Sequence, residues 1–143
     1  MTFRDAGPGD ILQIQNIRQS VLENRLSNPA LVSDEDCKEY ILRRGKGWVC
    51  ECDGKLVGFA IADLVEENLW ALFIRPEYDG RGIGKKLMEL ALHWYFSKNK
   101  QRIWLSTAPG TRAEIFYKMQ GWTEFGRMEN GEVLFQLEKI VEK

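Results

Sequence analysis

The segment RPEYDGRGIGKKLMELALHWY, residues 75–95, constrains the fold of this 143-residue chain more than any other feature. It follows an apolar run, LWALFI, that is typical of a strand, and Pro76 ends that run because proline has no N–H to give to a sheet ladder. A clear helical pattern of apolar residues then begins at once. Between strand and helix lie three glycines in five positions, Gly80, Gly82 and Gly84.

A strand that turns into a helix across bare backbone exposes the first N–H groups of that helix beyond the end of the strand. These donors and the helix dipole together favour an anion, and glycine lets the backbone approach it closely. The spacing GRGIGKKL does not fit G-x-x-x-x-G-K-[ST] of nucleotide-binding loops, nor G-x-G-x-x-G of dinucleotide-binding folds. An anion site of another kind and a purely structural turn both remain open from these residues alone.

Apolar patterns in the rest of the chain alternate between strand and helix periods. Asp10 and Ser33 are candidate N-caps for two helices, and Asp53-Gly54 and Asn130-Gly131 are hairpin turn signals. The expected order is β, α, α, β, β, β, α, β, α, β, β. We therefore expect an α/β (α+β) fold of three layers, with a mixed, mostly antiparallel central sheet of about six to seven strands and helices on both faces. Strands are expected at 2–6, 47–52, 56–64, 67–74 and 102–107 and in a hairpin over 122–140, and helices after Asp10 and over 33–44, 82–97 and 111–120.

The helix over 82–97 is expected to lie on the sheet through one apolar stripe, because its large apolar residues recur at helical offsets. Length and the absence of linkers or repeats indicate one domain over residues 1–143. The expected stripe consists of Ile83, Leu87, Leu90, Ala91 and Trp94.

The charge balance excludes several classes of partner. Twenty Lys and Arg against 21 Asp and Glu leave no broad basic surface, so a nucleic-acid partner is not expected. No run of 18 apolar residues and no leader pattern occur in the sequence, so we expect a cytoplasmic protein without membrane attachment. One His and three Cys do not supply a convincing metal site, and no metal is expected.

Two motifs carry a resemblance to a known family. LFIRPEYDGRGIGKKLMELA is similar to the acyl-CoA binding motif of the GNAT family of N-acetyltransferases, V/I-x-P-x-[YF]-[QR]-G-x-G-[IVL]-G-x-x-L, and TRAEIFYKMQGW resembles its second signature, A-x-x-[FL]-Y-x-x-x-G-[FW]. The order of elements also matches over nearly the whole chain, and ENRLSNP and TAPGTRAE resemble a bacterial-type subgroup of uncharacterised members. Two positions depart from the pattern: Asp79 replaces a Gln or Arg, and Gly110 replaces a common Asn.

The resemblance implies acetyl-CoA as cosubstrate and assigns roles to particular residues. The pantetheine arm would lie along the strand, and a backbone N–H near Ile74 would polarise the thioester carbonyl. The diphosphate would be bound by the glycine loop, and Phe116 of the second motif would also contact the cofactor. The implied set is Leu72, Phe73, Ile74, Gly80, Arg81, Gly82, Ile83, Gly84, Lys85 and Phe116.

Acetyl transfer to an amine requires removal of a proton from the amine and delivery of one to the departing thiolate. Tyr117 occupies the position of the family's motif Tyr and is the candidate general acid, since a phenol is protonated at neutral pH. Glu67 is a candidate base, although a hairpin glutamate facing water fits it equally well, and Ser106 stands where some members carry a Glu. Glu23 is a candidate contact for a cationic substrate.

Three functional hypotheses follow. The first is an N-acetyltransferase that acetylates a primary amine, either a small molecule or a protein amine, by direct attack with Tyr117 as acid. The second is a non-catalytic acyl-CoA binding or sensing domain, which Asp79 and Gly110 make worth testing. The third is an interaction module without a ligand. Dimers are frequent in the family, so a homodimer is compatible with the resemblance.

Overall fold

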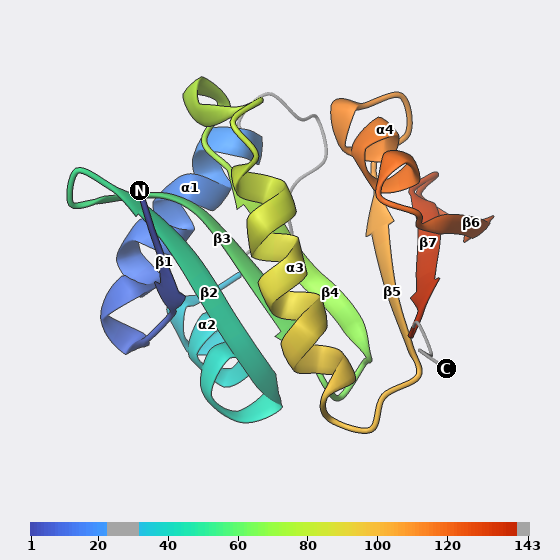
Figure 1. Ribbon diagram of the computed structural model, residues 1–143, viewed down its shortest axis with the longest axis horizontal. Coiled ribbons are helices and arrows are strands. Elements are labelled where there is room, and N and C mark those ends of the chain that lie inside the picture. The colour runs from blue at the N-terminus through green and yellow to red at the C-terminus, as the bar shows by residue number, and fades with distance from the viewer. Residues whose placement is uncertain (23–31, 140–143) are drawn as a thin grey trace.

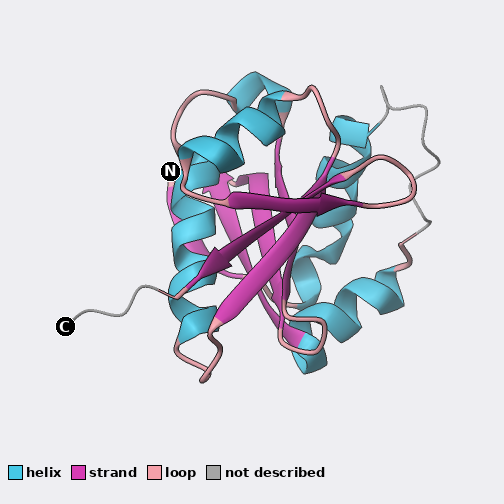
Figure 2. Ribbon diagram, turned by 90° about the vertical axis from the view of Figure 1, so that its right-hand side faces the viewer, coloured by secondary structure: helices cyan, strands magenta, loops and turns pink. Residues whose placement is uncertain are grey.

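The computed structural model describes residues 1–22 and 32–139, which form a seven-stranded sheet with helices on both faces (Figures 1 and 2). The observed order of strands and α-helices is the one expected from the sequence, and the mixed, mostly antiparallel α+β fold is confirmed. The elements are β1 (Thr2–Asp5), a 3-10 turn (Pro8–Asp10), α1 (Ile11–Leu22), α2 (Asp34–Glu39) continued by a π-helical turn (Tyr40–Arg44), β2 (Gly45–Cys52), β3 (Lys55–Asp63), β4 (Asn68–Ile74), a 3-10 turn (Pro76–Tyr78), α3 (Ile83–Phe96), β5 (Arg102–Thr107), α4 (Arg112–Met119), β6 (Thr123–Arg127) and β7 (Val133–Glu138).

The sheet has one unusual junction. Its spatial order is β1-β2-β3-β4-β5-β7-β6, and every neighbouring pair is antiparallel except β4 and β5. These two parallel strands pair at one position, Asn68 opposite Trp104. From that contact they diverge toward the ends that carry the glycine loop and α4 (Figure 1). The sheet therefore consists of two fully paired parts that are joined at one end and open at the other.

A β-bulge lies in β4 just after its contact with β5. Ile61 of β3 faces Ala71, whereas the next residue of β3 faces Leu69, so Trp70 is the extra residue. Its side chain and that of Ala71 both lie on the face of the sheet covered by α1, although adjacent strand residues normally alternate. Bulges bend a strand and increase its local twist, which is consistent with the divergence of β4 from β5 here.

Two apolar cores hold the layers together. On one face, α1, α2 and the π-helical turn pack on β3 and β4 through residues such as Ile17 and Ile41. On the other face, α3 and α4 pack on the strands through residues such as Leu87 and Tyr117. Figure 2 shows the strands as a layer between the two sets of helices. This arrangement leaves the ends of α1, α3 and α4 around the open part of the sheet.

The apolar stripe of α3 differs from the expected one. Ile83, Leu87 and Ala91 are buried as expected, but Met88 and Tyr95 are also buried, whereas Leu90 and Trp94 are only partly buried. The face of α3 that packs on the sheet is therefore rotated from the expected one, toward Met88 and Tyr95 and away from Leu90 and Trp94. The Tyr95 hydroxyl can lie at this depth because it donates a hydrogen bond to the Arg102 carbonyl oxygen at 2.6 Å.

The caps at the two N-terminal helices differ from each other. Ser33 caps α2 as expected: its hydroxyl accepts a hydrogen bond from the Asp36 N–H at 3.0 Å. Asp10 is not the N-cap of a helix. It closes the 3-10 turn that leads into α1, and its carboxylate accepts a hydrogen bond from the Gly7 N–H at 2.8 Å. Helical structure therefore begins at Pro8, earlier than expected, because proline favours the first position of a helical turn.

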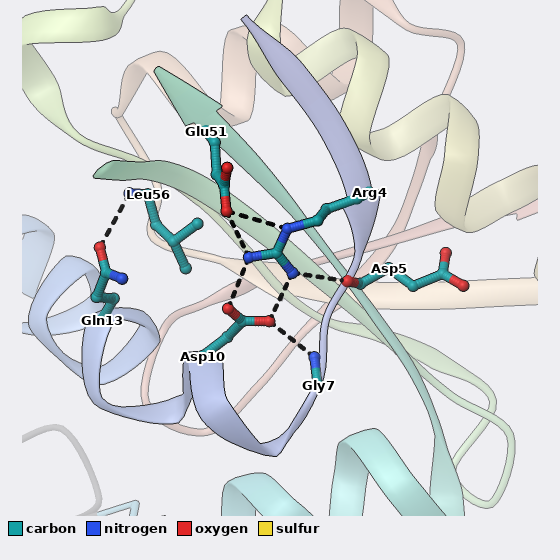
Figure 3. A network of polar contacts seen from close by, with 7 residues as sticks. All are labelled: Arg4, Asp5, Gly7, Asp10, Gln13, Glu51 and Leu56. Carbon is teal, nitrogen blue, oxygen red and sulfur yellow. Dashed lines mark hydrogen bonds and ion pairs between the residues drawn. The ribbon is translucent and has the colours of Figure 1, made fainter. Parts of the chain in front are cut away.

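Arg4 ties the start of the chain to the sheet and to α1 (Figure 3). Its guanidinium donates to both carboxylate oxygens of Asp10, at 2.8 and 2.9 Å, and also to Glu51 on β2. These hydrogen bonds lower the pKa of Asp10, which is largely buried. The network therefore fixes the entry of α1 relative to β1 and β2.

We predict that Asp10→Asn lowers the free energy of unfolding by about 1–3 kcal/mol, because it removes charge-assisted hydrogen bonds. A carboxyl whose folded pKa is depressed stabilises the fold above its unfolded pKa, near ~3.9, and this contribution disappears as the pH falls through the folded value. Denaturant titrations at pH 7 and at pH 3 measure both effects. Glu35→Gln, an exposed acid of α2, is the control, and an equal loss in the two variants would contradict the role of the network.

Candidate active site

A cavity of about 1230 Å³ occupies the opening between β4 and β5. It is lined by β4 beyond Asn68, the glycine loop, the first turn of α3, the end of β5, α4, the C-terminal half of α1 and the turn between β6 and β7. Ligand cavities are typically ~300–1,000 Å³, so this one has room for a large ligand together with a second molecule. The residues expected to bind the cofactor line it, Arg81 excepted: Leu72, Phe73, Ile74, Gly80, Gly82, Ile83, Gly84, Lys85 and Phe116.

The edge of β4 that faces the cavity has free backbone groups. On its other side β4 pairs with β3 from Asn68 to Ile74, but toward β5 the ladder stops at Asn68 within the part of the chain that the structure describes. Backbone donors and acceptors of the strand are therefore available to an extended ligand. An amide-containing chain can add to such an edge in the way that a further strand would.

The glycine loop places the N-terminus of α3 at the same cavity. Gly82 is the N-cap and has φ of 80°, a conformation that costs a residue with a Cβ substantial strain. No side chain caps this helix end among the described residues. The N–H groups of Ile83, Gly84 and Lys85 are the ones that lack partners in a first helical turn, so they are available to an anion.

The side chains around this helix end are mainly basic. Lys85 lines the cavity directly, and the Arg81 guanidinium lies over the Tyr78 ring, 4.9 Å from its centre. Asp79, the acid that departs from the family pattern, has its carboxylate 3.6 Å from an Arg112 guanidinium nitrogen of α4. This pair is largely exposed, so it offsets the charge of Asp79 more than it stabilises the fold.

Tyr117 reaches the cavity from α4, which begins at the N-cap Thr111. Its ring packs against Phe116, Trp122 and Phe135, with centroid distances of 5.3, 5.6 and 6.2 Å. Burial raises the pKa of Tyr117 above its ordinary value, and its hydroxyl makes no hydrogen bond to the described residues. The Tyr117 ring is thus held in the cavity wall by aromatic neighbours, and its phenol is protonated at neutral pH.

Glu132 is a cavity residue that the sequence did not single out. It lies in the turn before β7, and its carboxylate accepts a hydrogen bond from the Ser106 hydroxyl of β5 at 3.0 Å. Both side chains line the cavity. By the family resemblance, Ser106 stands at a position where some members carry a Glu. The pairing of Ser106 with a carboxylate from the turn before β7 depends on the register of β5 and β7, which sequence spacing alone does not reveal.

Glu67 lies apart from the other candidate residues. It forms the turn between β3 and β4, at the end of β4 opposite the glycine loop, and its carboxylate is 2.9 Å from the Lys100 ammonium. It does not line the cavity, so the structure does not place it with Tyr117. Glu23, the candidate contact for a cationic substrate, lies outside the described residues. Within those residues no group of three or more His, Cys, Asp or Glu side chains could hold a metal ion, and no helix is long and apolar enough to cross a bilayer.

One cavity thus combines an open strand edge with a helix N-terminus that no side chain caps among the described residues. The acetyltransferase (GNAT) family model matches residues 11–122. The chain therefore belongs to the GNAT family, which confirms the family resemblance.

Similar proteins of known sequence fall in the same class. The chain is 36% identical over 120 residues to an uncharacterised N-acetyltransferase of Prochlorococcus marinus, covering 80% of this chain and 63% of that protein. It is 31% identical over 136 residues to the spermine/spermidine N(1)-acetyltransferase of Bacillus subtilis, covering 86% of each. The chain thus spans less than two thirds of the first of these relatives.

Solved structures share the fold. The PaiA N-acetyltransferase of Thermoplasma acidophilum, determined in complex with coenzyme A, superposes with a TM-score of 0.80 at 18% identity, covering 96% of this chain and 98% of that one. A ribosomal-protein-alanine N-acetyltransferase of Brucella melitensis gives the same TM-score at 20% identity, covering 97% of this chain and all of that one. At these identities the likeness establishes the fold.

We predict that Gly82→Val abolishes the thermal stabilisation of the protein by coenzyme A, because a branched side chain at positive φ distorts the helix N-terminus. Gly54, in the turn between β2 and β3, has φ of 77° and equally open surroundings, so Gly54→Val carries a similar backbone strain at a glycine that does not line the cavity. Both variants should lose stability by about 1–3 kcal/mol. Thermal unfolding with and without coenzyme A separates them: retained stabilisation of Gly82→Val would contradict a diphosphate site at this loop.

Proposed function

We propose that this chain transfers the acetyl group of acetyl-CoA directly to a primary amine. The observation that carries the proposal is the convergence on one cavity of an open strand edge, an uncapped helix N-terminus and a buried, protonated tyrosine. Each feature answers one requirement of the reaction. The strand edge aligns the thioester, the helix end binds its phosphates, and the tyrosine supplies a proton.

The residues present fit acetyl-CoA. The amides of Ile83, Gly84 and Lys85 would bind the diphosphate, with Lys85 and Arg81 adding charge at that end of the cavity. Leu72, Phe73 and Ile74 would offer backbone groups to the pantetheine arm, and Phe116 closes the cavity from α4. When bound, acetyl-CoA supplies an activated acyl group; among the cavity-lining residues that the structure describes there is no cysteine to accept it, which supports direct attack by the amine.

Tyr117 would act as the general acid. As the amine nitrogen bonds to the carbonyl carbon, the carbon–sulfur bond breaks and the sulfur must take up a proton. The Tyr117 hydroxyl can give that proton, because a phenol is protonated at neutral pH. Burial raises the pKa of Tyr117 and so makes it a weaker acid, and the transfer therefore depends on the negative charge that develops on the departing sulfur. A backbone N–H near Ile74 would stabilise the negative charge that develops on the carbonyl oxygen.

Glu132 is our candidate for the group that removes the proton from the amine. An alkyl ammonium has a pKa near ~10.4, so an acceptor for its proton is needed at neutral pH. Apart from Asp79, which faces Arg112, Glu132 is the carboxylate that lines the cavity within the described ranges. The Ser106 hydroxyl holds it in place and leaves carboxylate lone pairs for the amine or for an intervening water.

The acceptor is a primary amine of a small molecule or a protein. Related proteins are described as acting on both kinds: a peptidyl-lysine N-acetyltransferase of Escherichia coli is 33% identical over 86 residues, and the Bacillus subtilis relative acts on spermine and spermidine. Acetyl-CoA stabilisation of the fold together with release of thiol in the presence of amines would support the proposal. Stabilisation without thiol release over a broad panel of amines would instead identify an acyl-CoA binding domain.

We predict that Tyr117→Phe lowers kcat by about 10–1,000-fold and leaves the affinity for acetyl-CoA nearly unchanged. Its stability should change little, because the hydroxyl makes no hydrogen bond within the described structure. Tyr95→Phe is the matched control, since it removes a buried hydroxyl that bonds Arg102 and should cost about 1 kcal/mol of stability while sparing kcat. An unchanged kcat for Tyr117→Phe would refute the role of general acid.

We predict that Glu132→Gln lowers kcat/KM for the amine by about 10–100-fold at pH 7 and that raising the pH recovers part of the loss, because more of the amine is then neutral. Glu129→Gln removes the same charge from an exposed position of the same turn and is the control. Initial rates from pH 6 to pH 10 measure the effect. If both variants behave like the wild type, another group accepts the proton.

A further inference from the structure

Arg18 lies on α1, on the opposite side of the sheet from α3, and lines the wall of the cavity. Its Nε atom is fully enclosed and has no hydrogen-bond partner. Desolvation lowers the pKa of Arg18, yet a guanidinium stays charged at neutral pH. The cavity wall therefore contains a half-buried cation that has no anion beside it among the described residues.

The bulge in β4 positions the two aromatic rings that contact this cation. Trp70 and Phe73 are three residues apart, so in a regular strand they would lie on opposite faces. The extra residue at Trp70 brings both rings to the α1 face. The Arg18 guanidinium carbon lies 4.9 Å from the centre of the Trp70 ring and 5.4 Å from that of Phe73. Tyr40 stacks on Trp70 with centroids 3.7 Å apart and fixes the indole plane.

Arg44 is a second arginine that stacks on an aromatic ring, and it differs from Arg18 in having an acid partner. Its guanidinium also lies over an aromatic ring, that of Tyr40, at 4.4 Å. Arg44 nevertheless has an acid partner, because it forms a two-point ion pair with the buried Asp63, with distances of 2.7 and 3.1 Å. Arg18 forms no ion pair with the described acids. The aromatic rings contact the flat faces of the Arg18 guanidinium. The N–H groups along its edge therefore stay available to a ligand.

We propose that Arg18 binds a carboxylate group of the amine acceptor, so that the acceptor is a small carboxylate-bearing amine. This inference rests on the proposed acetyl transfer. A guanidinium and a carboxylate form paired hydrogen bonds of matching geometry, and their strength increases where water is excluded. The same positive charge disfavours a polyamine, whose further ammonium groups it would repel. The acceptor class would thus differ from that of the Bacillus subtilis relative.

The test is an acceptor panel of matched pairs. Glycine, β-alanine, 4-aminobutyrate and glutamate are each compared with the corresponding carboxamide, and spermidine is included as a polycation. Thiol release from acetyl-CoA gives kcat/KM for each. The wild type should prefer at least one acid over its amide by about 100-fold or more, as expected when a buried polar group is left unpaired by the wrong substrate.

Substitutions of Arg18 test whether this side chain causes the preference for the acid. Arg18→Gln should reduce the preference for the acid by about 10-fold or more without changing KM for acetyl-CoA, and Arg18→Lys should keep part of it because it keeps the charge. Arg43→Gln, an exposed arginine after α2, is the control and should behave like the wild type. Preference for the amide or for spermidine, or a preference that Arg18→Gln leaves intact, would overturn the proposal while acetyl transfer itself stood.

A carboxylate could also come from the acyl donor, and succinyl-CoA distinguishes the two sources. A wild-type preference for succinyl-CoA over acetyl-CoA that is lost in Arg18→Gln would overturn the assignment to the acceptor. Calorimetry with coenzyme A and each N-acetyl amino acid of the panel tests the site without turnover. Binding of at least one by the wild type and not by Arg18→Gln would support a carboxylate site at Arg18 independently of the rate of turnover, and equal or absent binding would contradict it.

Discussion

The separation of β4 from β5 is the constraint on which the rest of the structure depends. Two parallel strands that pair only at Asn68 and Trp104 leave backbone groups of β4 without partners, a cost that a folded chain usually avoids. Each half of the sheet has a helix of its own, since α3 packs on β2, β3 and β4 whereas Tyr117 of α4 packs on Phe135 of β7. The fold thus keeps a strand edge open in its interior, where a ligand with amide groups can satisfy it.

The chemistry is arranged around this opening by the elements at its rim. The end of β4 leads into the glycine loop, so the anion-binding helix end necessarily lies at the tip of the open strand. α4 follows β5 and brings Tyr117 to the other side, while β7 pairs with β5 and brings Glu132 against Ser106. The bulge at Trp70 places the rings of Trp70 and Phe73 on the α1 face, where they contact the Arg18 guanidinium. The groups proposed for cofactor binding, acid, base and acceptor contact therefore line one cavity, although they come from β4 with the glycine loop, from α4, from the turn before β7 and from α1.

Much of this arrangement could be predicted from the sequence. The glycine loop, the order of strands and α-helices, and the placement of Tyr117 follow from local patterns and motif spacing, because each depends on residues close together in the chain. The buried face of α3 could be predicted only in part. Met88, Tyr95, Leu90 and Trp94 are all large apolar residues, and only tertiary packing determines which of them face the sheet. Arg18 and Glu132 were missed because they depend on a bulge and on strand register. Glu67 lies next to the start of β4, as the sequence indicates, but this end of the strand does not line the cavity.

The most direct test of this account is a crystal structure of the protein with coenzyme A. The account predicts the diphosphate within hydrogen-bond distance of the amides of Ile83, Gly84 and Lys85, and the pantetheine arm along the β5-facing edge of β4. Phosphates bound elsewhere, or a β4 edge left free by the bound coenzyme, would contradict it.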